Sequence, residues 1–540
     1  MLTIAPLRLP LKITALLLLL GAFQSTTASA QTRDTGGRLI LVLPFDNRTG
    51  QPNLAWIGDS FPDTLNQRLT SAGFLTITRD DRLYALDHLG LPADFRPTRA
   101  TTIRMAQTLD ADYVVVGSYT VRDGRITAQA QTLSINQLRL SAPLEDSSPL
   151  DHLFDVENGI AWKVAHQVDP KFRVAEQTFL AASSGVKLIA FENYIRGTDE
   201  ANSEERIKHL QQALQDTPNY PAALLALGKV QYTSRLYDQA AATLAKVPAG
   251  DRLSLEANFY LGLARFNAAK YSAAETAFGF VASRLPLPEV VNNQAVAASR
   301  QSKDAVALFQ RASTADPNDA DYHYNVAVGL FNRGDAPGAI REVETALKLH
   351  AADAEAAELH TRLLANKSVT GTPLKNAVTA GGFDPVPRIR RTYSEASFRQ
   401  AAFQMDQMRA IRMATLPPAE QATQYTKLGR DYLSAGLIPE SEQEFQSALT
   451  ADSNSAPAHA GLAQIREQSG NAADARTEAQ TSLKIQPNAQ ALLVLARLEL
   501  QANNLPAAAS DVSAALHLEP ANSAVLGMKQ ALANRGQSLP

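Results

Sequence analysis

A spacing of about 34 residues recurs through most of this chain and constrains its fold more than any single side chain does. A large apolar residue followed by a small one marks the repeat, at successive separations of 34, 65, 102, 34 and 33 residues: Leu227-Gly228, Leu261-Gly262, Val326-Ala327, Leu428-Gly429, Leu462-Ala463 and Leu495-Ala496. Prolines fall near the expected ends of several units, at Pro218, Pro286, Pro317, Pro487 and Pro520. A period of this length predicts an array of helical repeats in place of one globular core.

Each unit is predicted to be two antiparallel helices joined by a turn. Small side chains let two helices approach closely, and proline ends a helix because it lacks the backbone donor. Gly334-Asp335, Gly436 and Gly470-Asn471 share one position between the two helices, where a left-handed residue is favoured. One pair cannot bury its apolar face alone. Neighbouring pairs must therefore stack, and the product is a superhelix with a long concave surface.

One unit matches a known repeat pattern almost column by column, and a second unit matches it clearly. Their matching residues are Asp321-Tyr322-His323-Tyr324-Asn325-Val326-Ala327 with Gly334-Asp335, Ala339, Val343 and Ala346, and Tyr260-Leu261-Gly262 with Tyr271, Ala274, Phe278 and Pro286. This pattern resembles the tetratricopeptide repeat family. The resemblance predicts about five repeats over 187–353, three over 422–520 and a C-terminal capping helix over 521–535. It implies a right-handed superhelix with grooves that bind a protein or peptide partner.

The repeat pattern is lost between residues 354 and 421, although the units on either side stay in phase. Degenerate repeats would keep the superhelix continuous, whereas an insertion would split it into two blocks. The turn-rich stretches 371–373 and 381–385 favour a loop. After them, one long helix is predicted from an apolar stripe: Phe398, Ala402, Met405, Met408, Ile411 and Met413. We expect this stripe to pack in a core, the alternative being an adaptable binding face.

The first thirty residues differ from the rest of the chain. Arg8 and Lys12 precede an apolar run over 13–23, and Ala28-Ser29-Ala30 follows it. This pattern predicts a signal peptide over 1–30, cleaved after Ala30. The mature chain is expected to have no transmembrane segment, because no later apolar run approaches about 18 residues. We therefore expect a periplasmic protein, with secretion to the medium as the alternative.

Residues 38–170 are predicted to form a separate domain with a small mixed sheet. The apolar runs 39–43 and 113–116 are typical of buried strands, and the intervening stretches have helical spacing. Asp123-Gly124 between two alternating segments is a strong hairpin signal. Residues 171–186 are interpreted as a linker. The fold class is thus a two-part α+β chain, with an α/β domain followed by an all-α repeat superhelix.

Three motifs carry a second resemblance: Val42-Leu43-Pro44-Phe45-Asp46-Asn47, Trp56-Ile57-Gly58-Asp59-Ser60-Phe61, and the stretch Leu109 to Ser118. They resemble the TolB-type amino-terminal domain, an α/β module that is also similar to FlgO-like envelope domains. With the repeat array, they resemble a recurrent bacterial architecture. The β-propeller of TolB itself is absent, so no role of TolB is assigned to any residue here.

The sequence contains no recognised catalytic motif. The sequence holds no phosphate-binding glycine loop, no His-Glu-x-x-His and no Gly-x-Ser-x-Gly motif. With no cysteine, it also excludes disulfides and thiolate chemistry. Asp46, Asp59 and Asp63 could converge as an acid pair or cation site, although helix capping and a solvated face explain them more simply. We predict no catalytic residues, no cofactor, no metal site and no enzyme activity.

Binding is the function that the repeats favour. The first helix of each unit lines the inner surface, so six residues are candidates for an apolar peptide groove: Phe259, Leu263, Phe266, Tyr324, Val328 and Phe331. Packing alone is the alternative for these residues. Arg388, Arg390 and Arg391 form the densest basic cluster, which could attract an acidic partner or form a solvated face.

The sequence as a whole predicts a non-catalytic protein-protein interaction scaffold of the bacterial cell envelope. The alternatives are an accessory subunit of an envelope assembly or export complex, or an enzyme with an unrecognised site in the first domain. A net charge of −3 does not favour nucleic acid as a partner. The sequence does not predict the oligomeric state or the identity of the partner.

Overall fold

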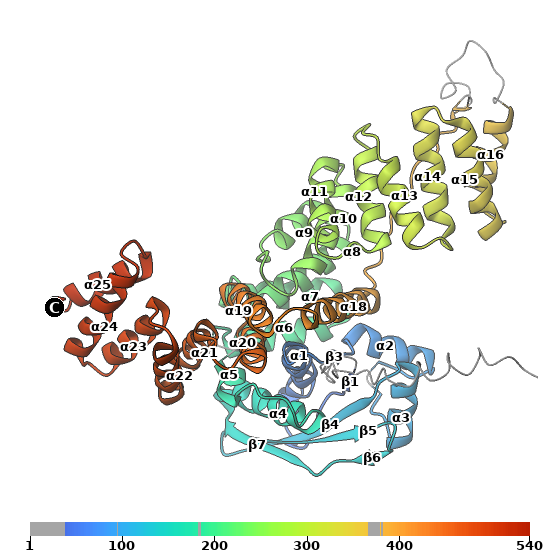
Figure 1. The fold of residues 1–540 in the computed structure, drawn as a ribbon. Coiled ribbons are helices and arrows are strands. Elements are labelled where there is room, and N and C mark those ends of the chain that lie inside the picture. The colour runs from blue at the N-terminus through green and yellow to red at the C-terminus, as the bar shows by residue number, and fades with distance from the viewer. Residues whose placement is uncertain (1–37, 94, 182–184, 366–377, 380–381, 540) are drawn as a thin grey trace, which may run out of the picture.

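The computed structural model describes residues 38–93, 95–181, 185–365, 378–379 and 382–539. The predicted signal peptide lies outside these residues, as does the turn-rich stretch 371–373. Figure 1 shows an α/β domain from which one stack of helices rises, while a second stack extends to the opposite side. This arrangement confirms the predicted two-part chain, with a mixed sheet first and helical repeats after it. No helix among the described residues has the length and apolar character that crossing a bilayer requires.

A mixed sheet with strand order β3-β1-β4-β5-β6 forms the centre of the α/β domain, and two further strands pair with it, β2 with β4 and β7 with β5. The strands are β1 (Leu39–Val42), β2 (Asp46–Asn47), β3 (Leu75–Thr76), β4 (Tyr113–Arg122), β5 (Arg125–Ser134), β6 (Arg139–Leu140) and β7 (Leu144–Pro149). Strand β1 runs parallel to β3 and β4, whereas β4 and β5 form the predicted antiparallel hairpin. Asp123 and Gly124 both have positive φ, as a tight two-residue hairpin turn requires.

Helices cover both faces of this sheet. They are α1 (Trp56–Ser71) and α4 (Leu153–Val168) on one face, and α2 (Arg79–His88) and α3 (Arg99–Thr108) on the other. Ile40 and Val42 belong to the first apolar cluster, whereas Leu41 and Leu43 belong to the second. A strand buried on both faces has apolar residues at successive positions, which explains the continuous run in the sequence.

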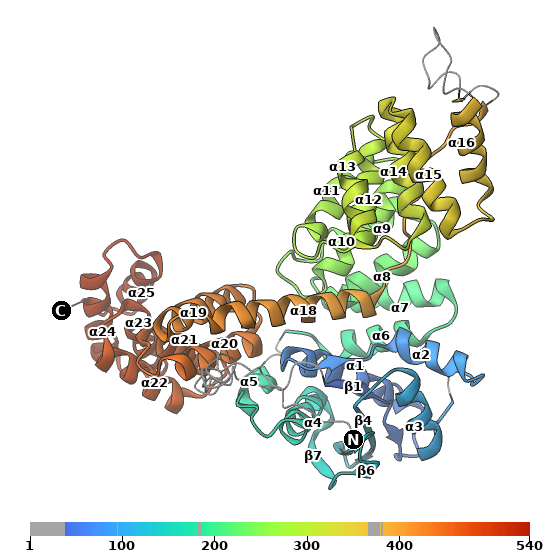
Figure 2. The same ribbon diagram turned by 45° about the vertical axis from the view of Figure 1, so that its right-hand side comes forward.

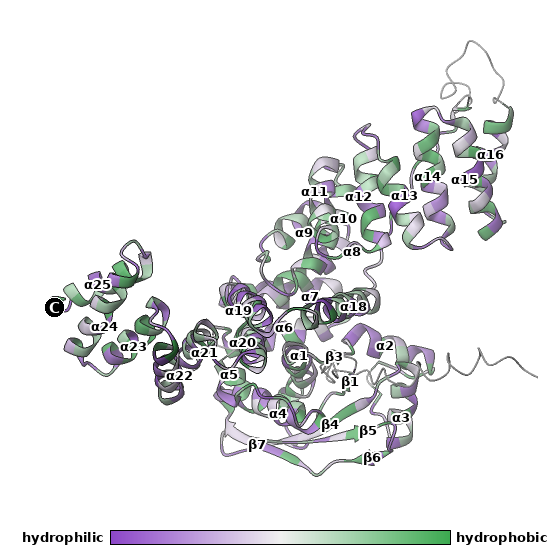
Figure 3. Cartoon of the chain, viewed as in Figure 1, coloured by the Kyte–Doolittle hydropathy of each residue, from purple (hydrophilic) through white to green (hydrophobic). Residues whose placement is uncertain are grey.

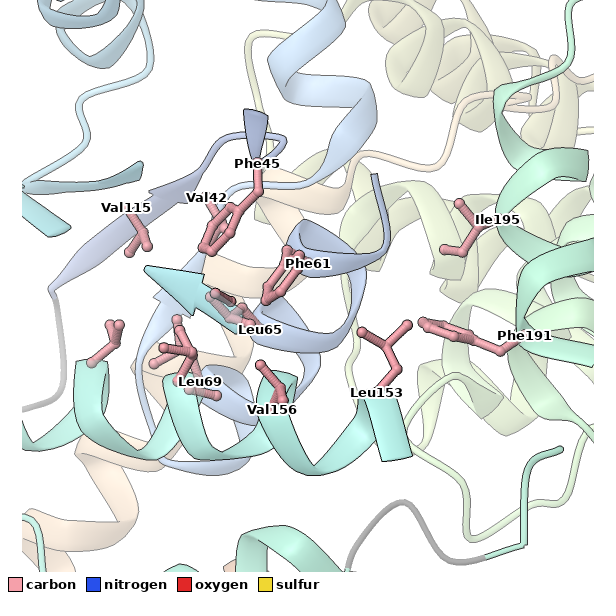
Figure 4. Packing of buried hydrophobic residues seen from close by; sticks show 14 of the residues in the cluster. Val42, Phe45, Phe61, Leu65, Leu69, Val115, Leu153, Val156, Phe191 and Ile195 are labelled. Carbon is pink, nitrogen blue, oxygen red and sulfur yellow. The ribbon is translucent and has the colours of Figure 1, made fainter. Parts of the chain in front are cut away.

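The α/β domain and the first stack share one apolar core. In Figure 4, Phe61 lies between Phe45 and Leu153 of α4, and the cluster continues from Leu153 to Phe191 in the first helix of the stack. All of these side chains are at most 3% exposed. The domain is therefore packed against the stack through a shared core.

The first stack is built from antiparallel helix pairs. Its helices are α6 (Leu188–Asp199), α7 (Ser203–Asp216), α8 (Pro221–Thr233), α9 (Tyr237–Leu244), α10 (Ser254–Asn267), α11 (Tyr271–Ala282), α12 (Pro288–Ser299), α13 (Val306–Ala315), α14 (Ala320–Arg333), α15 (Ala336–Leu349) and α16 (Ala354–Ala365). Figure 3 shows hydrophobic and hydrophilic residues side by side around these helices. Such amphipathic helices bury one face against their neighbours.

The second stack follows a single long helix. That helix is α18 (Glu395–Ala414), and the stack consists of α19 (Pro418–Ser434), α20 (Ile438–Ala451), α21 (Ala456–Gln468), α22 (Ala472–Ile485), α23 (Ala489–Gln501), α24 (Leu505–Leu518) and α25 (Ser523–Ala533). Figure 2 shows α18 crossing the space between the two stacks. Only the start of α18 joins a core, since Phe398 is buried while Met405, Met408 and Ile411 are 42 to 62% exposed. The prediction that the whole apolar stripe packs in a core is therefore wrong.

Part of the segment 171–186, which the sequence pattern predicts to be a linker, packs into the core of the α/β domain. It contains α5 (Glu176–Ala181), and Phe172, Val174 and Phe179 are each at most 5% exposed. These side chains extend the core beneath α4. A helix of only six residues is too short to give a clear periodic signal, so the sequence pattern resembled a connection.

One small residue of the repeat tests the packing of a helix pair. A Cβ added at Gly262 in α10 would lie 2.6 Å from the ring of Phe278, which is fully buried in α11. We expect Gly262→Ala to lower the free energy of unfolding by about 1–3 kcal/mol because the ring has no room to move. Gly527→Ala in α25 is the matched control, since a Cβ there meets nothing within 4 Å. The control is expected to raise stability by up to about 1 kcal/mol. Urea unfolding measures both variants, and a change in the free energy of unfolding of the same sign for both would contradict this packing.

Candidate peptide-binding groove

A non-helical segment of the chain lies along the inner face of the first stack. We call residues 383–394 the return segment, since they connect the end of that stack to α18 and have no helix or strand of their own. Arg388 contacts α14 and α16, Arg390 contacts α12 and α14, and Tyr393 reaches α10. The segment therefore runs past the helices in the reverse of their order in the chain.

Buried asparagine side chains hold the main chain of the return segment. Asn325 accepts a hydrogen bond from the N–H of Arg388 at 2.6 Å and donates one to its carbonyl oxygen at 2.8 Å. Asn293 makes the same pair of bonds with Arg390, at 2.8 and 2.7 Å. Asn292 adds a second donor to the Arg388 carbonyl at 2.9 Å. An amide side chain presents the donor and acceptor of a backbone, so these contacts recognise an extended chain through its peptide groups.

Carboxylates surround the side chain of Arg388. Its guanidinium lies 2.8 Å from Asp321, 2.6 Å from Asp353 and 3.0 Å from Glu355, and stacks 3.9 Å from the ring centre of Tyr324. Hydrogen bonding from Arg388 lowers the pKa of Asp353, which keeps this buried carboxylate charged. Such forked, charge-assisted bonds are specific for arginine, because an ammonium group cannot reproduce their geometry.

Arg390 occupies a neighbouring acidic site. It forms ion pairs with Asp319 and, at 3.0 Å, with Asp321, and it lies 5.1 Å from the ring centre of Tyr322. Arg391 is exposed. Two of the three clustered arginines are therefore satisfied inside the protein, and the interpretation of the whole cluster as a solvated face is wrong for Arg388 and Arg390.

Aromatic contacts anchor the end of the return segment. The rings of Tyr393 and Phe398 lie 4.1 Å apart, and they approach Phe259 of α10 at 5.5 and 6.2 Å. Ile389, between the two bound arginines, packs against the apolar clusters of the stack. The groove thus provides three kinds of contact: amide pairing to the main chain, carboxylates for alternate side chains, and an apolar surface.

Comparison with known families identifies the repeats. Models of the tetratricopeptide repeat match residues 199–265, 294–357, 426–489 and 463–525. This chain is a tetratricopeptide repeat protein. Among curated proteins, no relative matches it.

Solved structures are similar to parts of this tetratricopeptide repeat protein. YrrB, titled a TPR protein with an unusual peptide-binding site, is 15% identical, with 39% of this chain and 98% of that chain covered and a TM-score of 0.28. MamA from Desulfovibrio magneticus RS-1 is 16% identical, with 34% and 99% covered and a TM-score of 0.27. The LpoB C-terminal domain from Escherichia coli is 25% identical, with 21% and 84% covered and a TM-score of 0.19.

The six residues predicted for the groove have different positions in the repeats. Phe259 packs against the return segment, and Tyr324 lies beneath Arg388. Leu263, Val328 and Phe331 are at most 2% exposed inside the stack, and Phe266 is half-buried beside them. Phe259 and Tyr324 contact the segment that lies in the groove, and the apolar clusters that contain Leu263, Val328 and Phe331 pack against its Ile389.

The sequence interpretation missed the asparagines and acids that hold the return segment. Asn292 and Asn325 are 33 residues apart and pair with each other at 2.7 Å, so they occupy the same position in successive repeats. That periodicity of a polar residue on an inner face was the available signal. Aromatic and aliphatic side chains, from which the groove was predicted, do not carry this signal.

A buried polar network lies apart from this groove, in the α/β domain. Glu157 of α4 is fully buried and accepts hydrogen bonds from Ser60 and, at 2.7 Å, from Thr64. Burial raises its pKa to about 8. Nearby, Asp63 accepts a hydrogen bond from Tyr194 of the first stack, whereas Asp46 lies 3.6 Å from Arg96. Among the described residues, no group of histidines and carboxylates is arranged to hold a metal ion.

The network predicts a pH dependence of stability. Because the pKa of Glu157 is higher in the folded protein than its ordinary value of 4.5, folding favours the protonated form. The contribution of Glu157 to the free energy of unfolding is most favourable below pH 4.5 and is lost progressively as the pH rises towards 8. We expect Glu157→Gln, which stays neutral, to gain stability relative to the wild type by about 1–3 kcal/mol between pH 5 and pH 8. Urea unfolding of both proteins across this range measures the difference, and parallel pH profiles would contradict it.

Proposed function

We propose that this protein is an exported, non-catalytic interaction scaffold of the bacterial cell envelope that binds extended segments of its partners in repeat grooves. The observation that carries the proposal is the paired hydrogen bonding of Asn325 and Asn293 to the main chain of the return segment. The first groove is thereby suited to hold an extended polypeptide. The predicted signal peptide supports export, and the absence of a recognisable catalytic motif supports a binding role.

The second stack supplies a further surface for a partner. A hollow of about 420 Å³ lies on its inner side and is lined by residues of α19, α21, α23 and α25, among them Arg430, Gln464, Gln490, Leu493 and Arg497. Gln490 donates a hydrogen bond to Gln464 at 3.0 Å and accepts one from Arg430 at 3.5 Å. Amide and guanidinium groups on a concave surface can pair with the backbone and carboxylates of a bound chain. In this proposal the α/β domain docks to a second component.

Site-specific photo-crosslinking in the source cells tests the proposal. A photoreactive amino acid replaces Gln464 or Gln490 in the hollow, and Thr477 on the exposed side of α22 serves as the matched control. The expected result is a discrete protein adduct from the two hollow positions and none from the control. Mass spectrometry of the purified protein should give a mature amino terminus at Gln31. Equal labelling at all three positions, or an uncleaved protein in the cytoplasm, would contradict the proposal.

A further inference from the structure

The return segment is bound in the manner of a ligand. The N–H and C=O groups of both Arg388 and Arg390 pair with side chains of the stack, 63 to 97 residues away in the sequence. Backbone groups in a folded chain usually pair within helices and sheets. Here one surface recognises the peptide groups and the side chains of a separate extended strand, which is how repeat proteins and sheet edges capture peptides.

The groove is also more acidic than its occupant is basic. Four carboxylates, from Asp319, Asp321, Asp353 and Glu355, face two guanidinium groups. The occupied site therefore keeps an excess of negative charge. An excess of this sign attracts cationic segments and repels acidic ones, with an effect that weakens as salt concentration rises.

The bound segment remains partly accessible to solvent. The side chains of Arg388 and Arg390 are 24% and 34% exposed, and Glu355 is 40% exposed. Val386, just before the bound arginines, is also exposed. The segment therefore lies at the surface of the stack, and it can leave the groove without the helix pairs separating.

We propose that the groove formed by α12, α14 and α16 is a binding site for extended segments that carry the pattern Arg-apolar-Arg, and that residues 386–391 occupy it as an internal ligand. A partner segment of the same chemistry exchanges with this internal ligand. The inference rests on the proposed scaffold function and specifies the class of segment that the first groove accepts.

Competition with the internal ligand determines how tightly an added peptide binds. A segment tethered within the same chain has an effective concentration in the millimolar range, so a free peptide with the same contacts competes poorly against it. Weakening the internal ligand while leaving the groove intact should therefore increase the affinity for a free peptide. Weakening the groove should abolish binding.

Fluorescence anisotropy of the mature full-length chain tests this inference. The probe is a labelled peptide with the sequence of residues 384–393, DPVPRIRRTY, and the control peptide has alanine in place of the first and second arginines. The double variant R388A/R390A weakens the internal ligand, and R391A is its matched control because Arg391 is exposed. The double variant D321N/D353N weakens the groove. Circular dichroism and thermal unfolding check that every variant is folded.

The expected result is that the probe binds R388A/R390A at least about tenfold more tightly than it binds the wild type or R391A. Binding should fall with added salt, and it should be lost with the control peptide or when D321N/D353N is combined with R388A/R390A. If R388A/R390A does not fold, R388K/R390K replaces it, since lysine keeps the charge but loses the forked hydrogen bonds. No binding to the folded variant, or binding that is unchanged by D321N/D353N, would overturn the inference. Either failure would leave the crosslinking test of the second stack, and hence the scaffold proposal, intact.

Discussion

Replacing Asn325 with leucine is expected to lower the free energy of unfolding by about 2–4 kcal/mol and to release the return segment. Asn325 is fully buried and makes three hydrogen bonds, two to the main chain of Arg388 and one to Asn292. Leucine has a similar size but offers neither donor nor acceptor. The Arg388 N–H would lose Asn325 Oδ1 as its hydrogen-bond acceptor, and keeping this N–H in the groove would cost the energy of an unsatisfied polar group.

Urea unfolding and hydrogen exchange measure the two parts of this result. The amide of Arg388 should exchange rapidly in the variant, whereas amides within α14 should stay protected. Asn332→Leu is the matched control, because Asn332 lies in the same helix but is exposed. It is expected to change stability by no more than about 0.5 kcal/mol. Protection of Arg388 that survives Asn325→Leu would show that the asparagine does not hold the segment.

Glu442→Ala should separate the second stack from the α/β domain and cost about 3–5 kcal/mol. Glu442 in α20 is fully buried and accepts hydrogen bonds from the N–H of Ala175 at 3.0 Å and from the hydroxyl of Thr178. It also forms an ion pair with Arg466 at 2.7 Å. Removing the carboxylate leaves the positive charge of Arg466 beside α5 with no partner at this position, which is far more costly than losing a surface pair.

Small-angle scattering and chemical unfolding check this expectation. The radius of gyration should increase as the second stack detaches, and unfolding should divide into separate transitions. Glu420→Ala provides the comparison, since Glu420 is exposed in the first turn of α19 and contributes at most about 1 kcal/mol through the helix dipole. An unchanged radius of gyration for Glu442→Ala would mean that other contacts, such as the 3.2 Å ion pair of Arg252 with Glu440, are sufficient to hold the parts together.

The repeats could be predicted from the sequence because their packing is local. Gly262 in α10 faces Phe278 in α11, and two other units make the same kind of contact between their helices, Gly228 with Leu244 and Gly429 with Phe445. Nearest-neighbour packing imposes a regular spacing on the residues, so the spacing alone is sufficient to recognise it. The strands of the α/β domain could be predicted for a similar reason, since residues 39–42 are buried on both faces of the sheet.

The groove contacts could not be predicted in the same way. Arg388 meets Asn325 across 63 residues, and Arg390 meets Asn293 across 97, with no repeated spacing that connects them. An arginine cluster in a turn-rich segment has the composition of a solvated surface. Only the path of the chain back along the stack places its charges beside buried carboxylates. The exposure of the methionines of α18 could not be predicted for the same reason. It depends on the path of this helix, which crosses between the stacks and joins a core only at its start.

The return segment also has a consequence for the order in which the protein forms during synthesis. The helices that make its binding surface end at residue 365, before the segment that fills it has been made. The hydrogen bond between Ala175, just before α5, and Glu442 forms later still, since these two residues are 267 residues apart. Contacts of this separation form late, because a long intervening chain must first be brought together. A growing chain therefore passes through a stage at which its acidic groove is complete, open and available to any arginine-bearing segment nearby.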